Sequence, residues 1–291
     1  MAGNGAMKKR IAVGLASGLG NCIFMLPAIK ALYQLGHDIA LYVETDFPTA
    51  DLWKRCIYTT AVHEKSADLD GREAIAGEYC PASWKMVRLF QRAVLQQPLN
   101  CVWKSNMGLA QAYGYQDQAP DVSDWCRGLK RQIRWDVGMV PGSKGGTWLR
   151  KRWNRMSDVA GDFLSRGMTV AVFGLQEDGK EQIPGEQVES TGKLSELPEQ
   201  LAGCRVIIST DSGVGHLASS LGIPVIMIYT ATSPVKAAPV NQPHEVVYPH
   251  GLACYPCVSS MRWLACKVWK CHQQIDFQCI LAATERLGAQ Q

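Results

Sequence analysis

The chain repeats one pattern three times: a short apolar run, a glycine-containing loop, an apolar periodicity typical of a helix, and a second apolar run. The copies begin near Arg10, Val137 and Val206. Short apolar runs bounded by turns predict buried strands, and apolar residues three or four positions apart predict a helix that covers them. Repeated units of this kind form parallel sheets with helices on both faces and ligands at the carboxyl ends of the strands. The sequence therefore predicts an α/β protein.

A stretch without clear periodicity separates the first copy from the other two. Between residues 47 and 135, prolines and a glutamine-rich segment interrupt the apolar pattern. With 291 residues and 47% hydrophobic content, the chain can bury two moderate cores. We therefore expect two Rossmann-like domains facing each other across a cleft, residues 1–135 and 136–291, with a hinge near 134–136.

The loop of the third copy predicts an anion site. The apolar run at 206–208 leads into Asp211, Ser212 and Gly213, and a helix follows. The first amides of a helix have no intrahelical acceptor and carry the positive end of the helix dipole, so they attract phosphate. His216, one turn into the helix, is placed to face the same ligand. The structural alternative is that Asp211 and Ser212 only cap the helix and that His216 is a core residue.

Charge and hydropathy exclude several classes of protein. Lysine and arginine number 30 against 26 aspartates and glutamates, an excess that suits an anionic ligand but not a protein that coats nucleic acid. No apolar run is long enough to cross a bilayer, and the first ten residues are not followed by the apolar core of a signal peptide. We expect a cytoplasmic protein.

Four of the eleven cysteines form a group with the spacing Cys254-x2-Cys257-x8-Cys266-x4-Cys271. Paired thiols at short spacing suit tetrahedral binding of a thiophilic metal in a small C-terminal knuckle, with zinc as the first expectation. Four protein ligands leave no open position, so the metal would be structural. The alternative is four reduced thiols without a metal. The odd total and the scattered remaining cysteines argue against a fold built on disulfides.

Several motifs of the second half follow one another in the order and spacing of a known family. They are VGMVPGSK from Val137, KRW from Lys151, STGKLSEL from Ser190, DSGVGHLA from Asp211, GIPV from Gly222 and YTATSP from Tyr229. The chain thereby resembles glycosyltransferase family 9, the bacterial lipopolysaccharide heptosyltransferases and their relatives. The resemblance implies a GT-B fold, a nucleotide-sugar donor held mainly by the C-terminal domain, and inverting transfer without a catalytic divalent cation. Some relatives hold iron at a cysteine cluster, which makes iron the alternative to zinc.

The resemblance also implies which residues bind the donor. Lys151 is the catalytic position that reaches the donor diphosphate, Ser143 and Lys144 lie in the adjoining loop, and Glu177 follows the next strand, where it would bind ribose hydroxyls. The residues that close around the donor are Asp211, Ser212, Gly213 and His216. Residues 137–157 contain five lysines and arginines and no acidic residue. Fixed cations of this kind can stabilise a leaving diphosphate in place of a metal.

The first loop departs from the family at the catalytic position Asn21. Relatives usually have an aspartate there that acts as the general base, whereas an amide cannot take a proton at neutral pH. We expect Asn21 to orient the acceptor or to cap the helix. The base is then Glu44, Asp46 or Asp51, unless the acceptor needs little deprotonation or the protein is a poor enzyme.

These observations predict a glycosyltransferase that moves a sugar from an ADP-heptose-like donor to an acceptor hydroxyl. The acceptor stays open among a lipopolysaccharide core sugar, a protein and a hydroxylated DNA base. One alternative is a nucleotide-sugar-binding protein with little turnover, which Asn21 favours. Another is an interaction module built on the cysteine knuckle. The sequence defines neither the donor base and sugar nor the oligomeric state.

Overall fold

The computed structural model describes residues 8–45, 48–64, 72–76, 101–258 and 266–288. The chain divides into two compact units, Met1–Gly128 and Leu129–Gln291. The division falls a few residues before the segment 134–136. The amides of Arg134 and Trp135 both donate to the carbonyl of Gly203, at 2.7 and 3.0 Å, which ties this segment to the second unit.

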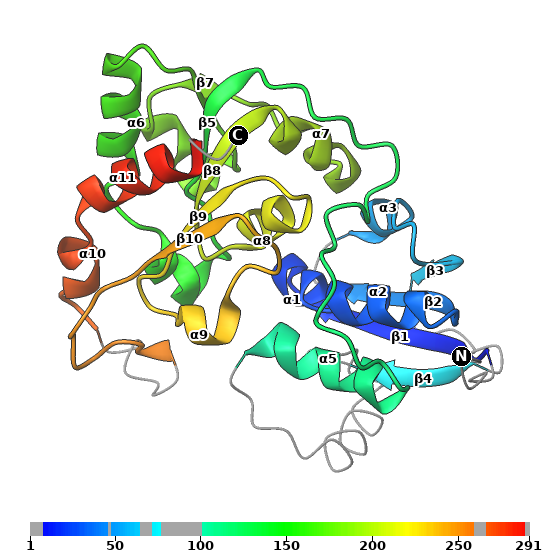
Figure 1. The fold of residues 1–291 in the computed structure, drawn as a ribbon. Helices are drawn as coiled ribbons and strands as arrows, with labels where there is room; N and C mark the ends of the chain where they lie inside the picture. Colours follow the sequence, from blue (N-terminus) through cyan, green and yellow to red (C-terminus); the bar gives the residue numbers. More distant parts are fainter. Residues whose placement is uncertain (1–7, 46–47, 65–71, 77–100, 259–265, 289–291) are drawn as a thin grey trace. The chain divides into compact units, whose positions relative to one another are not determined.

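The first unit contains a four-stranded parallel sheet with the strand order β3-β2-β1-β4 (Figure 1). Its elements are β1 (Arg10–Ser17), α1 (Leu19–Ile23), α2 (Leu26–Gln34), β2 (Asp38–Thr45), α3 (Ala50–Trp53), β3 (Ala61–Glu64), β4 (Glu73–Ala76) and α5 (Val102–Ala112). Strand β1 is buried from Ile11 to Ala16. Burial on both faces explains why this strand is a continuous apolar run rather than an alternating one.

The second unit contains a six-stranded parallel sheet with the order β10-β9-β8-β5-β6-β7. Its strands and α-helices are β5 (Trp135–Val140), α6 (Met156–Ser165), β6 (Val170–Val172), β7 (Glu186–Gln187), α7 (Leu197–Ala202), β8 (Cys204–Thr210), α8 (Gly213–Ser220), β9 (Val225–Ile228), α9 (Pro234–Ala237), β10 (His244–Val247), α10 (Lys270–Gln274) and α11 (Phe277–Gly288). Four short 3-10 helices also occur: η2 (Gly146–Lys151), η3 (Gln176–Asp178), η4 (Lys180–Gln182) and η5 (Leu194–Glu196).

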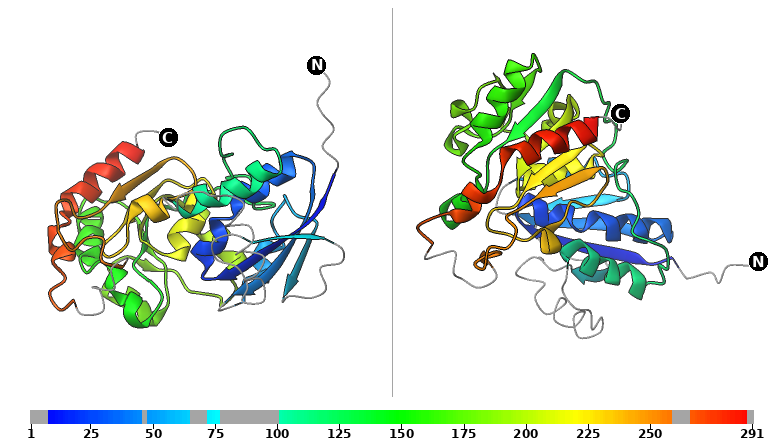
Figure 2. Two further views of the ribbon diagram at one scale, coloured as in Figure 1. Left: turned by 90° about the horizontal axis from the view of Figure 1, so that it is seen from below. Right: turned by 60° about the vertical axis from the view of Figure 1, so that its left-hand side comes forward.

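Helices cover both faces of this sheet. On one face, alternate strand residues such as Met139, Ile208 and Ile228 join apolar residues of α6 and α11 in the main core. The right-hand view of Figure 2 shows α11 lying across the strands of this sheet. On the other face α7 and α8 pack against β8. Helix α8 lies very close there, because a Cβ at Gly215 would be only 2.4 Å from Ser209 Oγ.

The strand order places a topological switch point between β5 and β8. From β5 the chain proceeds outward through β6 and β7, then returns to β8 and proceeds the other way. The loops after β5 and β8 therefore leave the sheet side by side at its carboxyl edge and diverge to opposite faces. Such a point is where doubly wound sheets bind ligands.

The structure confirms the α/β class and the parallel sheets expected from the three repeated units. Among the described residues, no helix has the length and apolarity required to traverse a bilayer. The ten cysteines within the described part of the chain form no disulfide with one another. A metal knuckle is not shown by the described residues around Cys254 to Cys271.

Candidate functional site

The candidate site lies at the carboxyl edge of the second sheet, at the switch point between β5 and β8. Strand β5 continues into Pro141, Gly142 and Ser143, and β8 continues into Asp211 and Ser212. The hydroxyl of Thr210 donates to the carbonyl of Gly142 at 2.7 Å and joins the two loops. Of the expected donor residues, Ser143, Lys144 and Lys151 follow β5, whereas Asp211 and Ser212 follow β8. Gly213 and His216 lie in α8, and Glu177 lies in the loop after β6.

Lys151 and Asp211 form an ion pair across this edge. The ammonium of Lys151, at the end of η2, lies 2.7 Å from Asp211 Oδ2 and donates to the Asp211 carbonyl at 3.1 Å. The side chains are 18% and 5% exposed. The ammonium also lies 5.0 Å from the ring centroid of Trp148. Three contacts therefore fix the position of this cation next to the start of α8.

The carboxylate of Asp211 is held by two further residues. Thr232, which follows β9, donates its hydroxyl to Asp211 Oδ2 at 2.5 Å, and His216 Nε2 lies 3.1 Å from Oδ1. Burial alone would raise the pKa of Asp211. The charge of Lys151 and the hydrogen bond with His216 outweigh burial, so the pKa lies well below its ordinary value. Asp211 is therefore ionised at neutral pH, and its buried charge is matched by Lys151.

The start of α8 provides hydrogen-bond donors beside this pair. Ser212 is the N-cap residue, and its hydroxyl accepts from the Gly215 amide at 3.3 Å. The amides of Gly213 and Val214 belong to the first turn, where a helix supplies no acceptor of its own. These amides and the helix dipole favour an anion at this end of α8.

Arg152 connects the loop after β5 with the loop after β6. It donates to the Ser143 carbonyl at 2.9 Å, to Asp178 Oδ1 at 2.7 Å and to the Glu177 carbonyl at 2.7 Å. The acidic residue bonded to this arginine is thus Asp178, and the Glu177 side chain is exposed. The hydroxyl of Ser143 donates to the Trp148 carbonyl at 2.9 Å, so it helps to fold the loop.

The expected basic cluster is largely neutralised within the chain. Lys151 pairs with Asp211, Arg152 pairs with Asp178, and Arg155 pairs with Asp158 at 2.9 Å. Lys144 is exposed in the loop after β5. An anion at this edge would therefore meet cations that already have carboxylate partners, together with the uncapped amides of α8.

The expected acceptor-side residues lie in the first unit. Ser17 ends β1 with φ of 67°, a left-handed conformation that is rare for serine, and Asn21 Nδ2 donates to Ser17 Oγ at 3.1 Å. Among the candidate bases, Glu44 is exposed and pairs in register with Ala16, whereas Asp51 binds Lys54 at 2.8 Å. The third candidate, Asp46, lies outside the described residues. Of these candidates, Glu44 therefore lies beside the end of β1, the strand end to which Asn21 of α1 is hydrogen-bonded.

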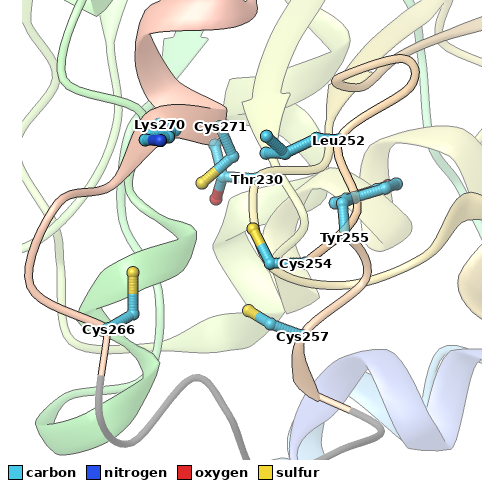
Figure 3. Close-up of a pocket in the computed structure, with 8 residues that line it drawn as sticks. All are labelled: Thr230, Leu252, Cys254, Tyr255, Cys257, Cys266, Lys270 and Cys271. Atoms are coloured by element: carbon cyan, nitrogen blue, oxygen red, sulfur yellow. The ribbon is translucent and has the colours of Figure 1, made fainter.

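The four grouped cysteines line one small pocket of about 50 Å³ in the second unit. Figure 3 shows Cys254 and Cys257 on one side of it, Cys266 and Cys271 on the other, and their sulfur atoms directed into the space between. Burial raises the pKa of Cys257, and it raises that of Cys271 to about 11. Within the described ranges, no three histidine, cysteine, aspartate or glutamate side chains are close enough together to hold a metal ion. The expected metal site is therefore not formed by the described side chains.

Three residues of this edge were not predicted from the sequence. Thr232 follows a strand and could have been found by the rule that identified Asp211. Asp178 adjoins Glu177, and two neighbouring acidic residues in a loop give no sign of which one turns inward. Gly215 is needed because α8 approaches the sheet at this residue, but its neighbours in sequence do not reveal that approach.

The chain is similar in sequence to known glycosyltransferases. The sequence profile of glycosyltransferase family 9 (heptosyltransferase) matches residues 38–267. Lipooligosaccharide heptosyltransferase 2 of Haemophilus influenzae is 28% identical over 125 residues, which span 38% of this chain and 36% of that protein. The chain therefore aligns with only about a third of the length of this curated relative.

Solved structures share the fold at lower identity. The ADP-heptose lipopolysaccharide heptosyltransferase II of E. coli superposes with a TM-score of 0.62 at 18% identity and covers 97% of this chain and 99% of its own. The iron-containing dodecameric glycosyltransferase TibC of enterotoxigenic E. coli has a TM-score of 0.66 at 15% identity, with 98% and 78% covered. Since the family profile spans most of the sequence, this chain belongs to glycosyltransferase family 9, the heptosyltransferase family.

Proposed function

We propose that the protein transfers a sugar from a nucleoside diphosphate sugar of the ADP-heptose type to an acceptor hydroxyl, with inversion and without a catalytic metal. The observation that carries the proposal is the position of the Lys151 ammonium, 2.7 Å from Asp211 and beside the start of α8, at the switch point of the second sheet. Membership of family 9 and the ADP-heptose named for a structural neighbour support the donor class. A GT-B arrangement of the two units belongs to the same proposal.

The proposed donor site stabilises the leaving group. As the bond between the anomeric carbon and the diphosphate breaks, negative charge grows on the phosphate oxygens. The amides of Gly213 and Val214 would donate to these oxygens, and Lys151 would share its protons between the phosphate and Asp211. Asp211, His216 and Thr232 then act on the reaction by holding Lys151 and the start of α8 in place. A preorganised set of this kind needs no divalent cation.

The proposed acceptor side lies at the carboxyl end of β1. Asn21 would orient the acceptor hydroxyl, because its amide can donate and accept hydrogen bonds but cannot remove a proton. Glu44 is the described carboxylate closest in the sheet to this strand end, since it pairs with Ala16. Ser143 and Lys144 on the donor side, and Glu177 toward the ribose, are proposed contacts that follow from the family resemblance.

The test is a transfer and hydrolysis assay with ADP-heptose, in which released ADP is measured with and without EDTA. We expect the wild type to release ADP in both conditions, and we expect the rate of ADP release to be about two orders of magnitude lower in a Lys151→Met variant. A strict magnesium requirement would contradict the metal-free scheme. If the protein binds the donor but neither hydrolyses it nor transfers the sugar to a lipopolysaccharide core, a protein or hydroxylated DNA, the alternative of a nucleotide-sugar-binding protein is favoured instead.

We also propose that Cys254, Cys257, Cys266 and Cys271 hold a structural zinc or iron ion. Their chemistry fits, since four thiols line one pocket and thiolates are preferred ligands of both metals. The iron named for the related TibC supports iron. When bound, the ion would tie the chain at 254–257 to the chain at 266–271. Elemental analysis of protein purified without added metal should give about one ion per chain, and less than about half an ion would end this proposal.

A further inference from the structure

Two residues outside the proposed donor site hold the turn that carries Lys151. The carbonyl of Arg150, the residue just before it, accepts a hydrogen bond from Thr230 Oγ1 at 2.7 Å and another from His272 Nε2 at 3.0 Å. A carbonyl oxygen has two lone pairs, so both are used. Because a carbonyl only accepts, the His272 ring must carry its proton on Nε2.

His272 also holds the chain on the other side of Lys151. Its own carbonyl accepts from the indole nitrogen of Trp153 at 3.1 Å, and Trp153 is buried in the main core. The side chain of Arg150 in turn donates to the Cys266 carbonyl at 3.1 Å. The turn at 150–153 is thus bonded to 266–272 at three points, and His272, which is 1% exposed, supplies two of them.

Thr230 belongs to the short segment that also positions the partner of Lys151. Two residues after Thr230, the hydroxyl of Thr232 donates to Asp211 Oδ2. The segment 230–232 therefore contacts the backbone next to the cation with one hydroxyl and the carboxylate with the other. A shift of this segment would move both members of the ion pair.

We propose that Thr230 and His272 are positioning residues for Lys151. They do not take part in the ion pair. They fix the Arg150 carbonyl and thereby the main chain from which the Lys151 side chain reaches to 2.7 Å from Asp211. The link to sugar transfer rests on the proposed function, in which Lys151 contacts the donor diphosphate. The effect of Thr230 and His272 on the position of Lys151 does not depend on the proposed function.

The test compares isosteric variants. Thr230→Val removes one hydrogen bond to Arg150 and keeps the shape of the side chain. His272→Phe removes the other, and His272→Gln restores a donor near the position of Nε2. Thr284→Val is the matched control, because the Thr284 hydroxyl is also buried and donates to a backbone carbonyl, that of Ile280 within α11 at 2.9 Å.

Two readouts are measured, along with thermal unfolding and metal content. The first is acetylation of Lys151 by acetic anhydride, quantified by mass spectrometry relative to the exposed Lys54. The second is the dissociation constant for ADP. We expect Thr230→Val and His272→Phe to raise the labelling of Lys151 several-fold and to weaken ADP binding about tenfold. His272→Gln should lie near the wild type, and Thr284→Val should change neither readout, even where it lowers the thermal midpoint.

The proposal is overturned if Thr230→Val and His272→Phe label like the wild type, if Thr284→Val gives the same increase, or if the changes follow metal loss instead of the deleted hydrogen bond. Failure of the proposed function looks different. In that case the wild type binds no nucleoside diphosphate, while the labelling of Lys151 still reports whether Thr230 and His272 hold it.

Discussion

Removing the cation of the central ion pair should destabilise the second unit as well as slow the proposed transfer. In Lys151→Met the side chain keeps most of its length but loses its charge. Among the described residues, His216 and Thr232 then remain as the side-chain hydrogen-bond partners of Asp211, whose side chain is 5% exposed. Breaking one partner of a buried ion pair costs about 3–5 kcal/mol. Lys151 is 18% exposed, so water can reach part of the space it leaves. We therefore expect a loss near the lower limit, about 3 kcal/mol.

This loss is large enough to measure by calorimetry. For a domain of this size, each kcal/mol shifts the Tm by roughly 2–4 °C, so the Tm should fall by roughly 6–12 °C. The double variant Lys151→Met/Asp211→Asn removes both charges and should recover part of the loss, with a coupling of at least about 1 kcal/mol. Lys54→Met is the control, because Lys54 and Asp51 form a pair of similar length that is exposed.

The reasoning is refuted by either of two results. One is a Tm of Lys151→Met equal to that of Lys54→Met. The other is a double variant that loses the sum of the two single losses, which would show that the charges do not interact. The sequence predicts a role for Lys151 only at the donor, and a purely catalytic role would leave the Tm unchanged.

Further predictions concern pH, packing and the metal. Because the pKa of Asp211 is lowered on folding, the contribution of its carboxylate to stability should be present above about pH 5 and be lost as the pH falls below about 4. The urea midpoint of the wild type should therefore approach that of Asp211→Asn only in acid. A difference between the two midpoints that does not depend on pH would contradict this. Gly215→Ala places a Cβ 2.4 Å from Ser209 Oγ and should cost about 1–3 kcal/mol, whereas Gly161→Ala in α6 has open space and should be neutral or stabilising in the same unfolding experiment. Treatment with a thiophilic chelator should lower the Tm of the wild type and leave that of Cys257→Ser unchanged, and equal effects on both would argue against a metal at the four cysteines.

The fold could be predicted because, in each copy of the repeated pattern, the local sequence signals indicate the same secondary structure. In the third copy of the repeated pattern, the apolar run of β8, the capping residue Ser212 and the apolar spacing of α8 all indicate a strand followed by a helix, and the structure forms both there. In the first copy the continuous apolar run from Ile11 indicates a strand that is buried on both faces. The order of strands in each sheet was not predicted, because it depends on contacts between segments far apart in the chain.

The candidate site could be predicted only in part, for a similar reason. The sequence indicates Asp211 as a polar residue after a strand and Lys151 as one of a run of basic residues, and the resemblance assigns both to the donor. Their mutual ion pair joins residues 60 positions apart and depends on β5 and β8 being neighbours. The same dependence hides Thr230 and His272, whose bonds to Arg150 span 80 and 122 positions. The cysteine spacing suggests four ligands, but spacing alone does not fix the distances between the sulfur atoms.

The central claim is that a nucleoside diphosphate binds at the start of α8 with Lys151 as its fixed cation. Isothermal titration calorimetry with ADP, on the wild type and on Lys151→Met below the temperature at which the variant unfolds, tests it most directly. The account predicts binding to the wild type and an affinity at least about tenfold lower in the variant. Equal affinities would contradict it, as would a wild type that binds neither ADP nor another nucleoside diphosphate.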